Sequence, residues 1–526
     1  FRGWFTSGII VDAEFCYLLS QKGMMWYLSP PYAWNPFRGG FLTATLGEGG
    51  FFRGNLHAYP LLLVQAVLVR LFGIDFSILE RILFFYPFLF CSVFSMYYLS
   101  HVFFKRRSVS FFSSLFYTFN MYPILESSQG HIWMSYALAP LVLAFFVKGL
   151  RTSSIRSTVA AGLTIFLSMS YDPRVLFYHL LPVFLYFLVG LIIKIGRVKL
   201  VEMLSSVKMF LVVCLVPLSL SAFWLLPLLL VPGAVSSSIP RGYAESFWPI
   251  VLSTCRVLDV MMFFYRVFWW NVSWTSSNIQ YLALAVISSL VILPMVSRQR
   301  RSDIIILTSM TLAFMFLAKG VNEPAGAVFL ALHDMLPTPV LMRYPYRFFE
   351  PLLLTAAPLF GFGVHLCLTE VERIGIHVDM PRISSRMIGR SVCSILVLTL
   401  LASTVHPALE GLPKAPLNLS PRKYTPNEYF EAMQWLEKQQ GDFRFWGLAT
   451  SPGFHLNDPE RALGGFDSRF QLMPWIEEIF LKNETKHLGK ILGLINTKYA
   501  LVLPPQDPQS QTDLNSFTEY LNALSE

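Results

Sequence analysis

Repeated apolar runs, each long enough to cross a bilayer, constrain the fold of this chain more than any other feature. Hydropathy gives about ten of them, because a transmembrane helix needs about 20 mainly apolar residues. Only 14% of the residues are charged, whereas soluble proteins carry about 25%. We therefore expect a polytopic α-helical membrane protein. The runs lie near Leu79–Phe104, Val109–Leu125, His131–Val147, Thr158–Tyr171, Val175–Ile193, Met209–Val231, Ile279–Val296, Ile304–Ala318, Phe348–Leu368 and Ser391–Val405.

Basic residues recur in alternate loops between these runs. Lys105, Arg106 and Arg107 follow the first run, and similar clusters follow the third, fifth, seventh and ninth. Cytoplasmic loops are enriched in Lys and Arg, so we expect these loops in the cytoplasm and the others outside. This distribution explains the net charge of +9, and we do not expect nucleic-acid binding. Both Phe1 and Glu526 then lie outside, and a transmembrane helix ahead of Phe1 is left open.

Composition divides the chain into three predicted segments. Residues 1–78 are expected to form an outward loop with interfacial helices, one of them at Ala58–Phe72. Residues 79–407 are expected to form the transmembrane helical bundle. Residues 408–526 have ordinary polarity and no spanning run, so an extracytoplasmic soluble α/β domain is expected there. The strand patterns of this domain lie at Arg444–Ala449 and Tyr499–Leu503.

Two carboxylates open the first outward segment. Asp12 and Glu14 lie among the apolar residues Ile9–Val11 and Phe15. Desolvation of this kind raises the pKa of a carboxyl group in general and suits it to general-base catalysis. Asp12 could instead cap the helix that follows, because Asp is a favoured N-cap residue. Glu14 could be a solvated surface residue, and both alternatives stay open.

Four further residues of this segment are candidates for chemistry or substrate contact. His57 and Tyr59 end the loop, and a His at this place could also be an interfacial or capping residue. Trp34 and Asn35 could form a platform for a sugar, whose apolar C–H faces stack on aromatic rings. The alternative for Trp34 is an interfacial aromatic belt.

Ionisable residues also fall at the predicted outer ends of later helices. His131 follows Ser127–Gly130, and Asp172 and Arg174 flank Pro173. Ionisable residues near a membrane boundary are candidates for a functional site. The alternative is that Asp172 pairs with Arg174 and caps a short outer turn.

Two arginines precede a late span. Arg343 and Arg347 flank Tyr344–Tyr346, and Glu350 lies one turn inside the span. The planar guanidinium matches phosphate geometry, and arginines outside run against the positive-inside trend. We expect them to bind a lipid-linked phosphate or pyrophosphate. The alternative is an internal pair of Arg347 with Glu350.

Several familiar motifs are missing from the sequence. The six cysteines show no CxxC spacing, and there is no Walker loop, no GxGxxG opening a helix and no HExxH. We therefore predict no protein-built metal centre and no nucleotide cofactor, while a divalent cation is left open.

Three stretches carry a resemblance to a known family. IIVDAEF opens the first outward loop, MRYPYRFFEPLLLTAAPLFGFG enters a late span, and LGKILGLINTKYALVLP lies in the C-terminal segment. In this order they resemble the GT-C superfamily of integral-membrane glycosyltransferases, and within it the arabinofuranosyltransferase-like and YfhO-like branches. The chain departs from the pattern at Val11-Asp12, where a Gly-Asp pair is usual. It also lacks the tryptophan-rich signature of oligosaccharyltransferase catalytic subunits, which Trp269–Asn271 resembles only superficially.

The resemblance implies a membrane glycosyltransferase of cell-envelope glycan biosynthesis. Such an enzyme takes a sugar from a polyprenyl-phosphate donor and transfers it to a glycan, glycolipid or glycoprotein at the extracytoplasmic face. By the match, Asp12 is the base or orients the acceptor. The alternative function is a non-enzymatic lipid-glycan transporter or an assembly scaffold. Transporters usually carry ionisable residues at mid-span or two related halves, and neither feature is visible in this sequence.

Overall fold

A computed structural model gives the arrangement of the helices. It describes residues 56–74, 78–79, 81–126, 130–194, 200–230, 253, 255–263, 278–297, 302–335, 344–374, 385–410, 435–436, 438–439, 444–448, 462–463 and 497–502. The chain divides into two compact units. One comprises residues 1–81, 223–238 and 419–526, and the other comprises 82–222 and 239–418.

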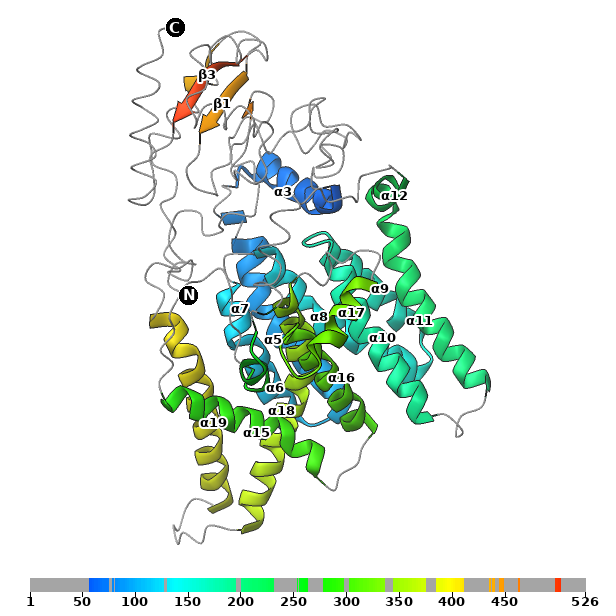
Figure 1. Ribbon diagram of the computed structural model, residues 1–526, viewed down its shortest axis with the longest axis vertical. Helices are drawn as coiled ribbons and strands as arrows, with labels where there is room; N and C mark the ends of the chain where they lie inside the picture. Colours follow the sequence, from blue (N-terminus) through cyan, green and yellow to red (C-terminus); the bar gives the residue numbers. More distant parts are fainter. Residues whose placement is uncertain are drawn as a thin grey trace. The chain divides into compact units, whose positions relative to one another are not determined.

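The second unit is a helical bundle (Figure 1). Its elements are α5 (Tyr86–Phe104), α6 (Arg107–Thr118), α7 (Met121–Leu125), α8 (Gly130–Thr152), α9 (Ile155–Met169), α10 (Val175–Lys194), α11 (Leu200–Leu220), α14 (Val257–Met261), α15 (Asn278–Val296), α16 (Ser302–Ala318), α17 (Gly326–Met335), the 3-10 helix η5 (Pro345–Phe348), α18 (Phe349–Ile374) and α19 (Ser385–Glu410). The π-helix η3 (Arg81–Phe85) runs directly into α5.

Five helices in the described part of the chain are long and apolar enough to cross a membrane. They span Arg81–Phe104, Ile132–Thr152, Val175–Ile193, Leu200–Leu220 and Pro345–Val371. Shorter apolar helices accompany them, among them α9, α15 and α16. These helices agree with an integral membrane protein, while the expected number of about ten spans stays a prediction.

Two of the predicted runs are wrong as single helices. Val109–Leu125 is divided into α6 and α7, and Met209–Val231 is divided into α11 and α12 (Ala222–Leu230). The first break has a clear cause in Asn120, whose side-chain amide donates to the carbonyls of Phe116 and Tyr117. Its Oδ1 accepts from the backbone N–H of Tyr122 and so starts a new helix. Asn commonly ends or starts helices in this way.

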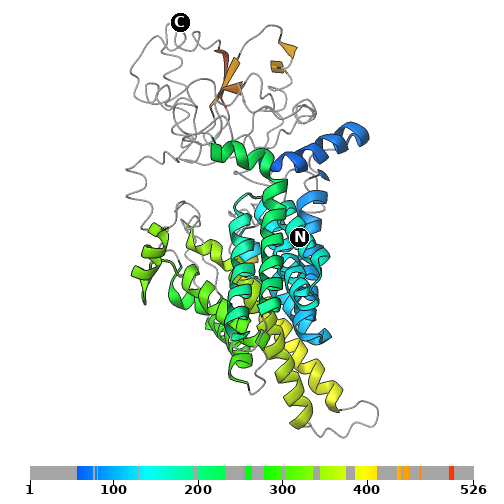
Figure 2. The same cartoon turned by 90° about the vertical axis from the view of Figure 1, so that its right-hand side faces the viewer.

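The long helices α8 and α18 form the centre of the bundle. Most of the apolar stretch of each is buried inside the protein, 83% in α8 and 78% in α18, against only 17% in α11. Helix α11 lies at one edge of the bundle in Figure 1, and Figure 2 shows α18 and α19 side by side. Two glycines let neighbours approach α18 closely. A Cβ on Gly361 would meet α6 at Val109, and one on Gly363 would meet the backbone carbonyl of Leu290 on α15.

The first unit contains one described long helix and a small sheet. Helix α3 (Tyr59–Phe72) follows the 3-10 helix η2 (Leu56–Ala58), begins with Pro60 in its first turn, and ends at Gly73, whose φ is 60°. The helix predicted at Ala58–Phe72 is thus confirmed, and its interfacial position stays a prediction. In η2, the His57 ring lies edge-on to Trp224 of α12, with centroids 6.2 Å apart.

Three strands of the first unit form a parallel sheet in the order β2-β1-β3. They are β1 (Arg444–Leu448), β2 (Ala462–Leu463) and β3 (Thr497–Val502). The strands β1 and β3 overlap the two that the sequence predicts. Most of residues 408–526 lie outside the described residues, so the α/β domain with those bounds stays a prediction.

Candidate functional site

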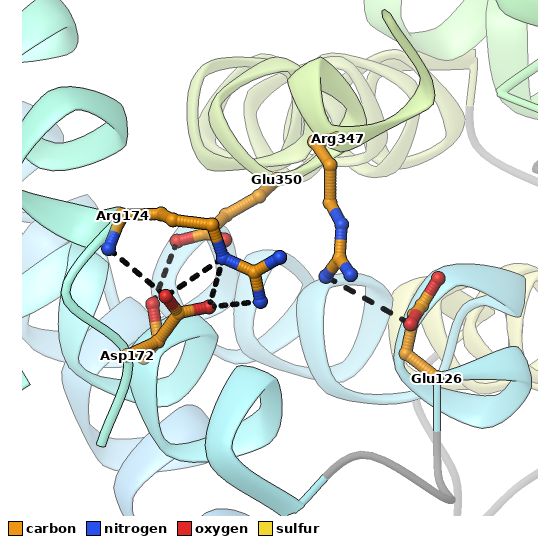
Figure 3. A network of polar contacts seen from close by, with 6 residues as sticks. Glu126, Asp172, Arg174, Arg347 and Glu350 are labelled. Atoms are coloured by element: carbon orange, nitrogen blue, oxygen red, sulfur yellow. Dashed lines mark hydrogen bonds and ion pairs between the residues drawn. The ribbon is translucent and has the colours of Figure 1, made fainter. Parts of the chain in front are cut away.

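Six ionisable side chains gather where α7, α9, α10 and α18 begin or end within the helical bundle. We call them the buried charge cluster: Glu126, Asp172, Arg174, His179, Arg347 and Glu350. All but Arg174 are less than a tenth exposed. Figure 3 shows how five of them face one another. Charges this far from water each cost several kcal/mol, so their presence calls for a reason.

Glu126 follows α7, which Asn120 has separated from α6. Its backbone N–H donates to the carbonyl of Tyr122 at 3.0 Å, which fixes it one turn past Tyr122. Trp133 of α8 fixes this turn, because its Nε1 donates to the carbonyl of Pro123. The Trp133 ring also stacks on the ring of Phe88, with centroids 4.3 Å apart. The Glu126 carboxylate is thereby placed in the protein interior, where it is 3% exposed.

Asp172 and Arg174 form a tight pair in the turn between α9 and α10. The Asp172 carboxylate accepts from Nε of Arg174 at 2.9 and 3.1 Å and from Nη2 at 2.7 Å. Its Oδ1 also accepts from the backbone N–H of Arg174 at 2.9 Å, which is a local turn of the kind that Asp favours. The turn-capping pair that the sequence left open is therefore present. The Arg174 side chain is 33% exposed and Asp172 only 6%.

Arg347 lies in η5, immediately before α18. Pro345 begins this short helix, and the backbone N–H of Arg347 donates to the carbonyl of Tyr344 at 2.9 Å. The guanidinium carbon lies 5.7 Å from the centre of the Tyr346 ring, within the range of a cation–π contact. Nη1 lies 3.9 Å from Oε2 of Glu126, an ion pair between side chains that are 8% and 4% exposed.

Glu350 sits in the first turn of α18 and has two partners. Its Oε1 lies 3.2 Å from Nε2 of His179 on α10 and accepts from the hydroxyl of Ser135 on α8 at 3.4 Å. The N-terminal turn of a helix favours a negative charge. Glu350 thus pairs with His179, and Arg347 with Glu126. The described ion pairs do not include the Arg347–Glu350 pair that the sequence left open as an alternative.

Two buried tyrosines connect the members of the cluster electrostatically. The charges of Arg347, Arg174, Asp172 and Glu350 all act on the hydroxyl of Tyr178. The two ion pairs and Glu350 are therefore close enough to influence the same group. Tyr122 interacts with Glu350, Arg347 and Glu126. Among these members three carboxylates face two guanidinium groups and the imidazole of His179.

The structure brings together Asp172, Arg174 and Arg347 of the residues predicted from the sequence. His57 and Tyr59 belong to the other unit, and the backbone of His131 lies in the first turn of α8. The remaining predicted residues lie outside the described residues: Asp12, Glu14, Trp34, Asn35 and Arg343.

Sequence reasoning missed Glu126, His179 and Ser135. A signal was available for the first two, because an ionisable residue at or inside an apolar run is a candidate by itself. Glu126 directly follows the run that ends at Leu125, and His179 lies within the run Val175–Ile193. Ser135 gave no such signal. The described residues hold no group of three or more His, Cys, Asp or Glu side chains that could bind a metal ion, and a divalent cation stays an expectation.

The fold is similar to that of solved oligosaccharyltransferase structures. Two solved structures of this class match 95% of the chain: the archaeal oligosaccharyltransferase AglB from Archaeoglobus fulgidus in complex with an inhibitory peptide and a dolichol-phosphate, at TM-score 0.53 and 11% identity, and the Archaeoglobus fulgidus oligosaccharyltransferase in complex with Zn and sulfate, at TM-score 0.54 and 13% identity.

The chain spans 66% and 65% of the length of those two proteins. At this identity the likeness concerns the fold. The resemblance of the sequence to the GT-C superfamily, and to its arabinofuranosyltransferase-like and YfhO-like branches, stays a prediction. No family model matches the chain, and no curated protein sequence is significantly similar to it.

Proposed function

We propose that this protein is a membrane glycosyltransferase that takes a sugar or glycan from a polyprenyl-phosphate-linked donor. The transfer takes place at the extracytoplasmic face, onto a glycan, glycolipid or protein acceptor. The observation that supports this most is a buried charge cluster with two arginines within a fold similar to that of oligosaccharyltransferases. One of those similar proteins was solved with a dolichol-phosphate, which favours a lipid phosphate as the donor class here as well.

The reaction needs positive charge at the leaving group. The acceptor oxygen forms a bond to the anomeric carbon, and the bond from that carbon to the phosphate oxygen breaks, which leaves a polyprenyl phosphate with an added negative charge. Arg347 and Arg174 carry guanidinium groups into the cluster, and Arg343 lies four residues before Arg347. Arginine matches phosphate geometry, and stabilising developing charge in a dry site is a large contribution to catalysis.

The acceptor must also lose a proton. We assign proton acceptance to Asp12 on the resemblance to GT-C enzymes, with Glu14 and then His57 as the next candidates. Sugar contacts are assigned to Trp34, Asn35, Tyr59 and His131, because aromatic and polar side chains of the first outward segment and of the α8 start suit a sugar.

The alternative function is a lipid-glycan transporter or an assembly scaffold without catalysis. The two differ in their products. A transferase forms free polyprenyl phosphate and a glycosylated acceptor, whereas a transporter moves the intact donor from one leaflet to the other. A scaffold does neither, although it binds the donor.

The test uses the full chain in nanodiscs and in liposomes. Radiolabelled polyprenyl-phosphate mannose, polyprenyl-phosphate glucose and a lipid-linked oligosaccharide are supplied as donors, with simple glycosides and an acceptor peptide. We expect release of polyprenyl phosphate with one of these donors. Movement of intact donor across liposomes without its cleavage would support the transporter instead.

Asp12→Asn separates a base from a helix cap. Asn caps a helix about as well as Asp, so folding is expected to stay normal. Loss of the proton acceptor is expected to lower the transfer rate by roughly 10²–10⁴-fold. The matched control is Asp334→Asn, since the Asp334 side chain is 77% exposed. Near-normal transfer by a well-folded Asp12→Asn protein would remove Asp12 from the catalytic role.

A further inference from the structure

We infer that Glu126 is an internal counter-ion of Arg347 and that Glu126 releases the arginine when the phosphate of the donor binds. Glu126 then determines how tightly an anionic lipid headgroup is held. The inference rests on the proposed phosphate role of Arg347 and adds a residue that opposes binding. It distinguishes the two arginines of the buried charge cluster, because their described ion pairs differ in length and in the number of hydrogen bonds.

The two ion pairs differ in geometry. Asp172 holds Arg174 through hydrogen bonds of 2.7 to 3.1 Å to two guanidinium nitrogens. Glu126 faces Arg347 with 3.9 Å between Oε2 and Nη1, which is an ion pair beyond hydrogen-bonding distance. Figure 3 shows the same contrast, since the Arg174 fork meets Asp172 at several points and Arg347 meets Glu126 along one line.

The two carboxylates also differ in the local structure that each one stabilises. Asp172 accepts from the backbone N–H of Arg174 and so builds the turn that starts α10. The same carboxylate therefore serves both the turn and the guanidinium of Arg174. Arg347 is held independently of Glu126, because its backbone donates to Tyr344 and its guanidinium lies 5.7 Å from the Tyr346 ring. The arginine therefore stays in place when Glu126 moves away.

Burial explains why a counter-ion is present at all. The Arg347 side chain is 8% exposed, and a buried charge without an opposite charge is strongly destabilising. In the absence of a donor, Glu126 neutralises Arg347. A phosphate oxygen that comes within hydrogen-bonding distance would form a charge-assisted bond, which is roughly twice as strong as a neutral one. The exchange thus replaces a long ion pair by a short one.

The charge balance points the same way. Three carboxylates of the cluster, Glu126, Asp172 and Glu350, face the two arginines. A phosphodiester brings one more negative charge into this field. Glu350 already contacts His179 and accepts from Ser135, and Asp172 is bound to Arg174. Glu126 is therefore the carboxylate whose charge opposes the phosphate directly.

The experiment measures the binding of polyprenyl phosphate, the leaving group itself, to the full chain in nanodiscs. Wild type is compared with Glu126→Gln, Glu126→Asp, Arg347→Ala and the matched control Glu370→Gln. The Glu370 side chain is 62% exposed and forms an ion pair with the exposed Arg373 one turn along its own helix. Melting temperature is followed for each variant, and polyprenol without phosphate reports binding of the lipid chain alone.

We expect Glu126→Gln to bind polyprenyl phosphate about tenfold more tightly, which is the change that about 1.4 kcal/mol of removed repulsion gives. The Arg347→Ala protein should bind more weakly, and Glu370→Gln and polyprenol binding should not change. Unchanged or weaker binding by Glu126→Gln would overturn the inference and make Glu126 a residue that orients Arg347.

If Glu126→Gln does not fold, Glu126→Asp decides, because it keeps the charge and withdraws it by one methylene. Binding at least equal to wild type supports exchange, and a loss overturns it.

Failure of the inference and failure of the proposed function give different results. If Arg347→Ala binds as wild type does, the phosphate role of Arg347 is wrong and the inference falls with it. If Arg347→Ala weakens binding while Glu126→Gln does not strengthen it, the phosphate role survives and the counter-ion exchange alone is overturned.

Discussion

The two ends of helix α8 lie next to two very different ion pairs. Glu126 precedes the helix and Arg151 lies in its last turn, so the two sites are about 30 Å apart at 1.5 Å per residue. Arg151 meets Asp303 of α16 at 2.6 Å, with side chains 35% and 19% exposed. Arg347 meets Glu126 at 3.9 Å, with side chains 8% and 4% exposed. The shorter pair is the more exposed one, and the longer pair is buried.

This contrast distinguishes charges whose expected role is to orient a helix in the membrane from charges whose expected role is to bind a ligand. A partly exposed ion pair at a helix end contributes little to stability, but basic residues there set the orientation of the helix. A buried ion pair of long separation does not recover the cost of desolvation by its own attraction. The buried charge cluster is therefore better explained by a ligand than by stability.

Arg347→Ala should have the largest effect at the buried end. Loss of a preorganised positive charge at a leaving group typically lowers the rate by roughly 10²–10³-fold. Arg347→Lys should fall between wild type and the alanine variant, because it keeps the charge and loses the planar fork. Steady-state transfer rates in nanodiscs measure this. Equal rates for all three proteins would assign Arg347 to structure and remove the contrast between the two ends.

Glu350→Ala should mainly affect folding. The carboxylate is 4% exposed and is the shared partner of His179 and Ser135. Removing one member of a buried ionic group typically costs about 3–5 kcal/mol. Glu350→Gln keeps an acceptor for Ser135 and should lose less. The measurement is the denaturation midpoint in detergent. A melting temperature of Glu350→Ala equal to that of wild type would show that the site is more hydrated than its burial indicates.

Gly363→Ala tests the packing of α18 against α15 without changing any charge. An added methyl group would meet the backbone carbonyl of Leu290, which cannot turn aside as a side chain can. Overpacking of this kind typically costs about 1–3 kcal/mol. Gly190→Ala is the matched control, because the nearest atom to its new Cβ is a side-chain methyl of Ile306 at 3.9 Å. Equal melting temperatures for the two variants would contradict the close approach of α15 and α18.

Apolar length predicted the positions of most helices, since hydropathy follows directly from composition. Asn120 broke the run Val109–Leu125 because its side chain competes for backbone groups, and hydropathy does not include that competition. The local pair of Asp172 with Arg174 was foreseeable, because the two residues are close in sequence. Glu126 with Arg347 was not, because the pair joins residues more than 200 positions apart and depends on the tertiary arrangement that brings the end of α7 near η5.

Arg151→Ala should have the smallest effect and completes the comparison. The guanidinium donates to Asp303 and to the carbonyl of Val102, and its carbon lies 5.6 Å from the Phe103 ring. Because the pair is partly exposed, its loss should cost only about 0.2–1 kcal/mol, and salt should reduce the difference from wild type further.

Melting of Arg151→Ala, Asp303→Asn and the double variant at low and high salt isolates the coupling between the two side chains. Polyprenyl phosphate binding should be the same in all of them, because the arginine lies about 30 Å from the buried charge cluster along α8. Two results would contradict this: a coupling energy as large as the stability that Glu350→Ala loses, or weaker binding of the lipid phosphate. Either would mean that both ends of the bundle serve the same site, and that burial does not separate the two ion pairs.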